Sequence, residues 1–104
     1  MAAAQLQKGE LEGRFRLVGE LSFDTVPQLI EQAAAVFPDC PELEVDLGGV
    51  RRSDSAGLAL LIEWVRQARA VDQTIRLVNM PEQMRDIVRV SGLDNVLPFG
   101  PAAG

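Results

Sequence analysis

Alternating apolar and polar positions predict three strands in this chain. Residues 14–18 alternate between arginine and apolar side chains, and residues 10–13 before them also have an extended pattern. A period of two is typical of a strand with one buried face. Residues 42–47 repeat the alternation with acidic and apolar side chains, and a third strand is expected at 74–78. The residues expected on the buried faces are Phe15, Leu17, Leu43, Val45, Leu47, Ile75 and Leu77.

Apolar positions spaced three or four residues apart predict three helices. The first begins at a cap formed by Asp24 or Thr25 and ends at Pro38. The second covers about residues 56–70, and the third follows a cap at Asn79. Strands that alternate with helices in this way predict an α/β fold with parallel crossovers.

The strands alternate in polarity instead of being apolar throughout, which indicates an open sheet with helices mainly on one face. A short strand at 95–99 and a frayed end at 100–104 complete the expected order. The chain has 104 residues and no interdomain linker. We therefore expect one domain over residues 1–104, with its core at about 10–99.

A polar turn precedes the second predicted helix. Ser53, Asp54 and Ser55 are followed by the small residues Ala56 and Gly57. In one interpretation these side chains only cap the helix, a contribution of ~1 kcal/mol. In the other, the small residues leave Ser55 uncrowded and the helix N-terminus open to a phosphate or a partner. The residues alone leave both interpretations open.

The same helix presents two apolar stripes. One must face the sheet, and Leu60 and Trp64 form a small ridge on another side, one turn apart. Burial under a neighbouring helix or loop is favoured for Leu60. For Trp64 a protein interface is favoured, because tryptophan is enriched among binding hot spots. The residues expected to bind a partner are Arg52, Ser53, Asp54, Ser55, Ala56, Leu60, Trp64 and Gln67.

Composition argues against catalysis and against several ligand classes. The chain has no histidine and no tyrosine, so Ser55 lacks a base for nucleophilic chemistry. The single cysteine, Cys40, has no histidine to share a metal with. We therefore expect a non-enzymatic protein with no metal and no cofactor.

Charge and hydropathy narrow the location and the partners. A net charge of −5 argues against nucleic acid and against unaided binding to anionic lipid. The apolar run at 56–62 is far shorter than the ~20 residues of a membrane span. We therefore expect a cytoplasmic protein without direct membrane insertion, which reaches a membrane only through a protein partner.

Two motifs resemble the STAS domain family, the fold of anti-sigma-factor antagonists. Val45-Asp46-Leu47, Val50 and Asp54-Ser55-Ala56-Gly57-Leu58 are similar to the core motif of that family. Members of the family often have Asp-Ser-Ser-Gly at this position, and the first serine is the one that is phosphorylated. By position that serine corresponds to Ser55, and Ala56 replaces the second serine. The resemblance implies a single STAS domain with an open mixed sheet, helices mainly on one face and a phosphorylation site at Ser55.

Residues 19–27 and 54–61 resemble more closely the STAS subunits of Gram-negative phospholipid transporters. This resemblance implies a subunit that binds and stabilises or activates an ABC transporter ATPase at the inner membrane, in a system that maintains outer-membrane lipid asymmetry. Such subunits often have threonine where this chain has Ser55, so a hydroxyl is retained. The alternative function is an anti-sigma-factor antagonist in a partner switch, controlled by phosphorylation of Ser55.

Overall fold

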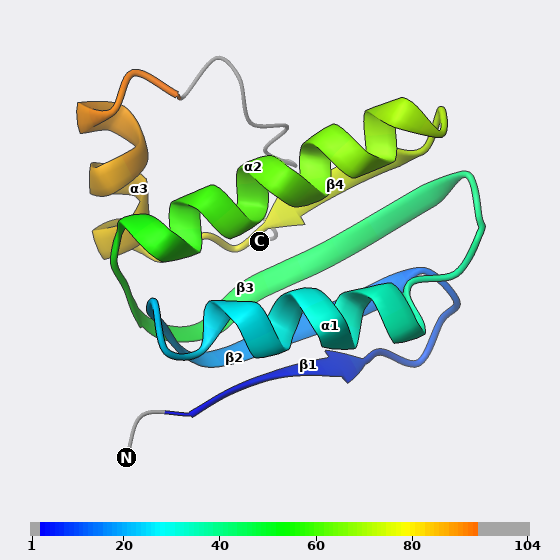
Figure 1. The fold of residues 1–104 in the computed structure, drawn as a ribbon, viewed down its shortest axis with the longest axis horizontal. Helices are drawn as coiled ribbons and strands as arrows, with labels where there is room; N and C mark the ends of the chain where they lie inside the picture. The colour runs from blue at the N-terminus through cyan, green and yellow to red at the C-terminus, as the bar shows by residue number, and fades with distance from the viewer. Residues whose placement is uncertain (1–2, 94–104) are drawn as a thin grey trace.

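The computed structural model describes residues 3–93. Strands and helices alternate along most of this part of the chain (Figure 1). In chain order the elements are β1 (Ala4–Lys8), β2 (Arg14–Leu21), α1 (Val26–Val36), β3 (Glu42–Ser53), α2 (Ser55–Ala70), β4 (Thr74–Val78) and α3 (Glu82–Val90).

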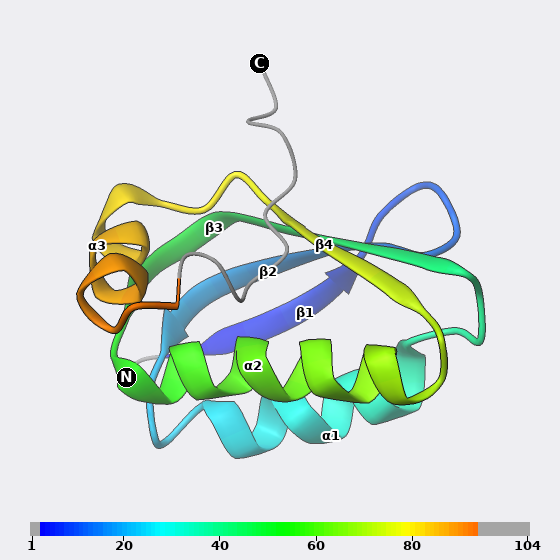
Figure 2. The same cartoon turned by 90° about the horizontal axis from the view of Figure 1, so that it is seen from above.

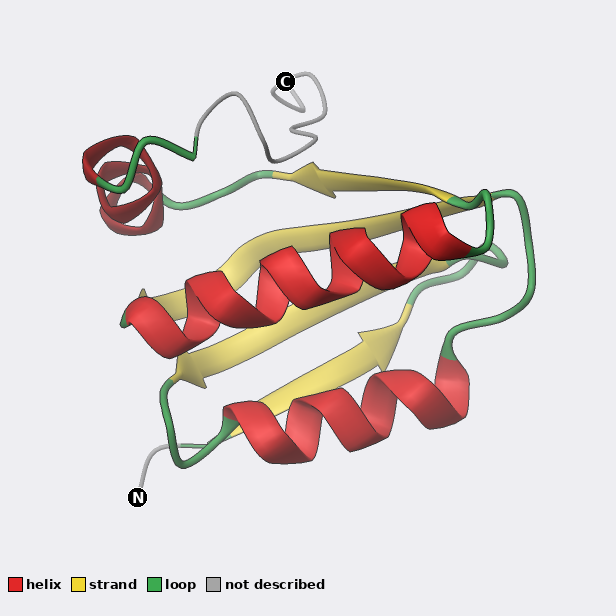
Figure 3. Ribbon diagram, turned by 45° about the horizontal axis from the view of Figure 1, so that its top comes forward, coloured by secondary structure: helices red, strands yellow, loops and turns green. Residues whose placement is uncertain are grey.

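The four strands form one mixed sheet in the order β1-β2-β3-β4 (Figure 3). β1 is antiparallel to β2, whereas β2, β3 and β4 are parallel to one another. Each parallel connection passes through a helix, and α1 and α2 lie side by side on one face of the sheet (Figure 2). The predicted α/β fold, an open mixed sheet with helices mainly on one face, is therefore confirmed.

The three predicted strands are present, and two of them extend beyond the predicted bounds. β4 has the expected bounds, β2 continues to Leu21 and β3 continues to Ser53. The extended segment predicted at 10–13 is wrong, because these residues form the turn between β1 and β2. The turn closes with Gly9 N–H donating to the Arg14 carbonyl at 2.7 Å. The short strand predicted at 95–99 and the frayed end predicted at 100–104 lie outside the described residues.

The three predicted helices are present, and the cap residue differs from the expected one only in α3. Thr25 is the cap residue of α1, one of the two predicted, but its side chain makes no capping hydrogen bond, because its hydroxyl donates to the Glu20 carbonyl. Pro81 and not Asn79 is the cap residue of α3, because Asn79 has the left-handed backbone angle φ of 57°.

The C-terminal end of α3 is closed by two backbone hydrogen bonds. Gly92, with φ of 73°, donates to the Arg89 carbonyl at 3.1 Å, and Leu93 donates to the Val88 carbonyl at 3.0 Å. This pair of bonds is typical of a helix that ends at a glycine.

The core lies between the two-helix layer and the sheet. It includes a row of aromatic rings in which the partly buried Phe37 contacts both Phe15 and Trp64, with centroid distances of 4.9 and 5.3 Å. Both pairs meet edge to face, the arrangement that aromatic quadrupoles favour. The row joins β2, the end of α1 and α2. The opposite face of the sheet carries charged side chains, and Glu44 lies 3.8 Å from both Arg14 and Arg76.

The outer edge of β1 is partly covered by α1. The backbone N–H of Leu6 donates to Oε1 of Gln32 at 3.1 Å. Edge strands usually present free backbone groups that another chain can pair with. At this position the α1 side chain takes the place of a further strand.

Candidate functional site

The polar turn lies at the carboxyl edge of the parallel strands. Leu21, the last residue of β2, pairs with Ser53, the last residue of β3, and the Leu21 carbonyl accepts from Asp54 N–H at 3.1 Å. The starts of α1 and α2 therefore lie at the same edge of the sheet (Figure 1). In open α/β sheets this edge is the usual place for ligand binding.

Asp54 caps α2, as one interpretation of the turn predicted. Its Oδ1 accepts from the Ala56 N–H at 2.8 Å, and its backbone is extended. Ser55 is the first residue of α2 and is exposed to solvent. The Asp54 carboxylate is engaged with the backbone, while the exposed position of Ser55 can receive a polar group from another molecule.

Ser53 is buried, with 3% of its surface exposed, so its predicted contact with a partner is wrong. Its hydroxyl donates to the Asp54 carbonyl at 2.9 Å. Its backbone is held by the side chain of Gln83 in α3 through two hydrogen bonds. No local signal in the sequence pointed to Gln83, because it lies 30 positions from Ser53.

Ala56 and Gly57 are small for a reason other than leaving Ser55 uncrowded. Both are buried. A Cβ built at Gly57 would lie 2.1 Å from Ser53 Oγ and 2.7 Å from Leu21 Cβ. Glycine therefore allows the first turn of α2 to approach the ends of β2 and β3. The predicted partner contact at Ala56 is wrong, because Ala56 is buried.

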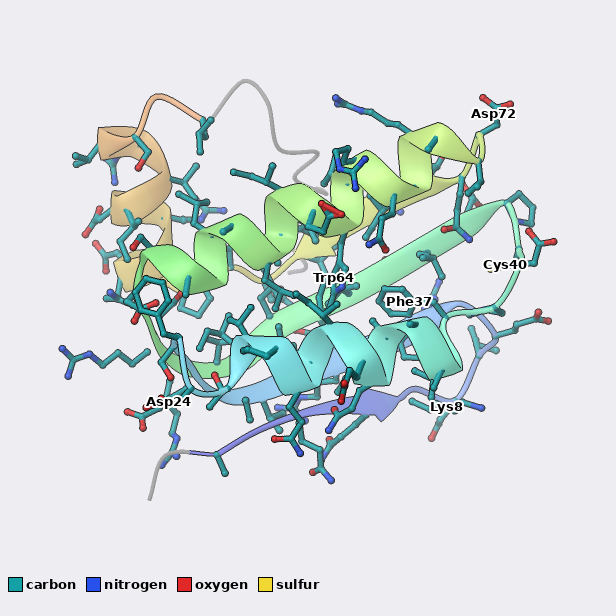
Figure 4. All side chains as sticks on the ribbon, viewed as in Figure 1. Lys8, Asp24, Phe37, Cys40, Trp64 and Asp72 are labelled. Carbon is teal, nitrogen blue, oxygen red and sulfur yellow. The ribbon has the colours of Figure 1, made fainter. Side chains whose placement is uncertain are left out.

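The Leu60–Trp64 ridge packs inside the molecule. The exposed fractions are 1% for Leu60 and 2% for Trp64, and the Trp64 ring meets Phe37 between α1 and α2 (Figure 4). The burial favoured for Leu60 is confirmed, so the inclusion of Leu60 among the residues expected to bind a partner is wrong, as is the partner contact favoured for Trp64. Helical periodicity correctly separated this ridge from the sheet-facing stripe, but it could not show that α1 covers the ridge.

The remaining predicted site residues lie on the surface. Arg52, Asp54, Ser55 and Gln67 are exposed. Gln67 donates through Nε2 to the Glu63 carboxylate at 3.1 Å. The same carboxylate also accepts from Arg66 at 2.6 Å. The hydrogen bond from Arg66 lowers the pKa of the Glu63 carboxyl below its usual value.

Two exposed apolar residues near this edge were not among the predicted site residues. Phe23, in the loop between β2 and α1, is 75% exposed, and Ile30, one turn into α1, is 38% exposed. Ile30 has the spacing of the inward stripe of α1, so its exposure could not be read from periodicity. Phe23 carried a usable signal, because it is a large apolar residue between the polar residues Ser22 and Asp24.

Residues 3–93 contain neither a candidate metal cluster nor a candidate membrane-spanning helix. This part of the chain contains no group of three or more Cys, Asp or Glu residues placed to hold a metal ion. None of its helices has both the length and the apolar character to cross a bilayer.

Comparison with known proteins decides the family. A family model described as "Mlab, STAS domain" matches residues 4–98. The chain belongs to the STAS domain family. The STAS domain is 30% identical over 94 residues to the intermembrane phospholipid transport system binding protein MlaB of Haemophilus influenzae. That alignment covers 86% of this chain and 90% of the relative. The resemblance seen in the sequence motifs is therefore confirmed.

Two solved structures share the fold of this STAS domain. An anti-sigma factor antagonist from Mycobacterium paratuberculosis has a TM-score of 0.78 and 24% identity, with 95% of this chain and 86% of that chain covered. The anti-sigma factor antagonist SpoIIAA in its unphosphorylated form has a TM-score of 0.70 and 22% identity, with 94% and 88% covered. At these identities the two structures show a common fold and no more.

Proposed function

We propose that this STAS domain is a non-enzymatic subunit of a phospholipid ABC transporter, and that it binds and stabilises or activates the transporter's ATPase. The observation that carries the proposal is the 30% identity to MlaB over most of both chains. Its partner would place it at the cytoplasmic face of the inner membrane, in a system that maintains outer-membrane lipid asymmetry.

The docking surface that we propose consists of the exposed residues at the starts of α1 and α2, namely Phe23, Ile30, Arg52, Asp54 and Ser55. It combines apolar side chains with a hydroxyl, a carboxylate and a guanidinium. Interfaces between proteins commonly have this composition, with apolar contacts and a polar rim. Gln67 is left outside the surface, because it lies about 18 Å further along α2 from Ser55 at the usual rise of a helix.

The mechanism follows from the rigidity of this edge. Asp54 holds the N-terminus of α2, and Gly57 allows that turn to sit close to the sheet. A surface that is already ordered loses little conformational entropy when it binds. The STAS domain would therefore act as a fixed support that holds the ATPase in a state competent for assembly, without chemistry of its own.

Replacing Ser55 with aspartate tests the docking surface. We expect Ser55→Asp to weaken binding to the purified ATPase by at least about tenfold, because it places a second carboxylate beside Asp54 in a contact that excludes water. The fold should remain, since a negative charge in the first turn of a helix is favourable. Isothermal titration calorimetry and thermal unfolding of the same samples measure the two effects.

Gln7→Glu is the matched control, because it adds one negative charge on exposed β1, away from the docking surface. It should bind the ATPase as the unchanged protein does. Equal affinity of Ser55→Asp and the unchanged protein would contradict the docking surface, and no binding by the unchanged protein would contradict the proposed function.

An anti-sigma-factor antagonist is the second candidate, favoured by the exposed hydroxyl position at Ser55, which corresponds to the phosphorylated serine of the STAS motif. Incubation with serine kinases from the same cells, followed by intact mass measurement, separates the candidates. Addition of one phosphoryl group to the unchanged protein, and none to Ser55→Ala, would support the antagonist. An unchanged mass with every such kinase would count against it.

A further inference from the structure

The last residue of β3 is held on one side by a strand and on the other by a single side chain. Ser53 pairs with Leu21 of β2. On its other side β4 accompanies β3 only as far as Asp46, which pairs with Val78. Among the strands that the structure describes, none flanks the end of β3 on the β4 side.

Gln83 of α3 occupies this position. Its Oε1 accepts from Ser53 N–H at 3.0 Å, and its Nε2 donates to the Ser53 carbonyl at 2.9 Å. One primary amide thus forms the donor and acceptor contacts that a neighbouring strand would supply. Since Ser53 is buried, an unpaired N–H or C=O there would be costly, and Gln83 satisfies both groups.

The contact bears directly on Ser55. Asp54 and Ser55 follow Ser53 without an intervening residue, and the Ser53 Oγ lies 2.1 Å from the position that a Cβ on Gly57 would take. A movement of Ser53 would therefore change both the Asp54 cap and the first turn of α2. Gln83 reaches the turn from α3, which lies beside the start of α2 (Figure 1).

We propose that Gln83 is a positioning residue that holds the turn 53–55 in a single conformation and thereby sets the affinity of the docking surface for its partner. The second half of this statement rests on the proposed function. The physical reason is preorganisation, since a turn that is already ordered does not have to be ordered on binding.

Amide hydrogen exchange of the isolated protein tests the positioning role. Gln83→Met keeps the length of the side chain and removes both hydrogen bonds. We expect the Ser53 amide to exchange at least about tenfold faster in this variant, as its acceptor is lost. The Leu93 amide, which donates to Val88 at the end of α3, should keep its exchange rate.

Two outcomes would overturn this role. An unchanged Ser53 rate would mean that Gln83 does not hold the turn. A matching loss of protection at Leu93 would mean that α3 as a whole has detached, which is a structural effect. Arg85→Met is the matched control, because Arg85 is an exposed residue of the same helix and its change should leave both amides unaffected.

Calorimetry with the purified ATPase tests the consequence for docking. We expect Gln83→Met to weaken binding by about tenfold and Arg85→Met to leave it unchanged. Gln83→Glu keeps an acceptor for Ser53 N–H but, when ionised, sets its second carboxylate oxygen against the Ser53 carbonyl, so its affinity should fall at least as far as that of Gln83→Met. Wild-type affinity in Gln83→Met, together with fast Ser53 exchange, would overturn the link to docking while the proposed function stands. If the unchanged protein does not bind the ATPase, the proposed function and the link to docking both fail, and exchange alone still decides the positioning role.

Discussion

Gly57 determines how closely the first turn of α2 approaches the sheet. We expect Gly57→Ala to destabilise the protein by about 1–3 kcal/mol, the usual cost of overpacking a tight site. The new Cβ would lie 2.1 Å from Ser53 Oγ and 2.7 Å from Leu21 Cβ. Urea unfolding followed by circular dichroism measures the change.

A gain in stability on replacing Gly57 with alanine would have an equally clear meaning. Alanine is a better helix former than glycine by about 1 kcal/mol, so a variant without a clash would be more stable. Ala59→Gly, at an exposed position of the same helix, measures that propensity term alone. A gain in stability for Gly57→Ala would contradict the close approach of α2 to the strands.

Individual residues of the turn were predictable only where their role is local. The Asp54 cap could be recognised because its partner, Ala56 N–H, is two positions away. The burial of Ser53 could not, since it depends on Leu21 and Gln83, which are distant in sequence. Local polarity marked the turn, whereas tertiary contacts decided which of its side chains face solvent.

At the level of elements, the contact between α1 and α2 depends on Trp64. We expect Trp64→Ala to lower the free energy of unfolding by about 3–5 kcal/mol, because it leaves a large cavity beside Phe37. Trp64→Phe should cost less, since an aromatic ring remains in the row. Chemical unfolding of both variants, followed by circular dichroism, checks the order.

The same variants distinguish a core residue from an interface residue. At a temperature where Trp64→Phe is folded, it should bind the ATPase with unchanged affinity, because residue 64 is buried. If Trp64→Phe kept full stability but lost binding to the ATPase, Trp64 would have to be counted as part of the surface that contacts the partner.

Elements with strong periodicity were predictable from the sequence, and an element with weak periodicity was missed. The strands β2, β3 and β4 alternate clearly, and all seven residues predicted on their buried faces are buried, although Leu21, Val50, Ser53 and Val78 are buried as well and were not predicted. β1 was missed because Ala4–Lys8 contains one large apolar residue, Leu6, among alanine, glutamine and lysine. Its position depends on pairing with β2, which a local pattern does not contain.

For the whole molecule, the single core predicts cooperative unfolding. Strands β2, β3 and β4 and all three helices contribute buried residues to one hydrophobic cluster. We therefore expect fluorescence of Trp64, which reports the helix layer, and far-ultraviolet circular dichroism to show the same urea midpoint. Two separate midpoints would contradict the prediction of one domain over residues 1–104.

The contact between Gln32 and β1 also affects how copies of the molecule meet one another. A sheet edge with free backbone groups can be extended by a strand from another copy, and repeated extension leads to aggregates. Because Gln32 already occupies the Leu6 N–H, an incoming strand would have to displace a side chain of α1 before it could pair at that position. The helix that begins at the proposed docking surface thus also hinders the addition of a further strand at Leu6, on the β1 edge of the sheet.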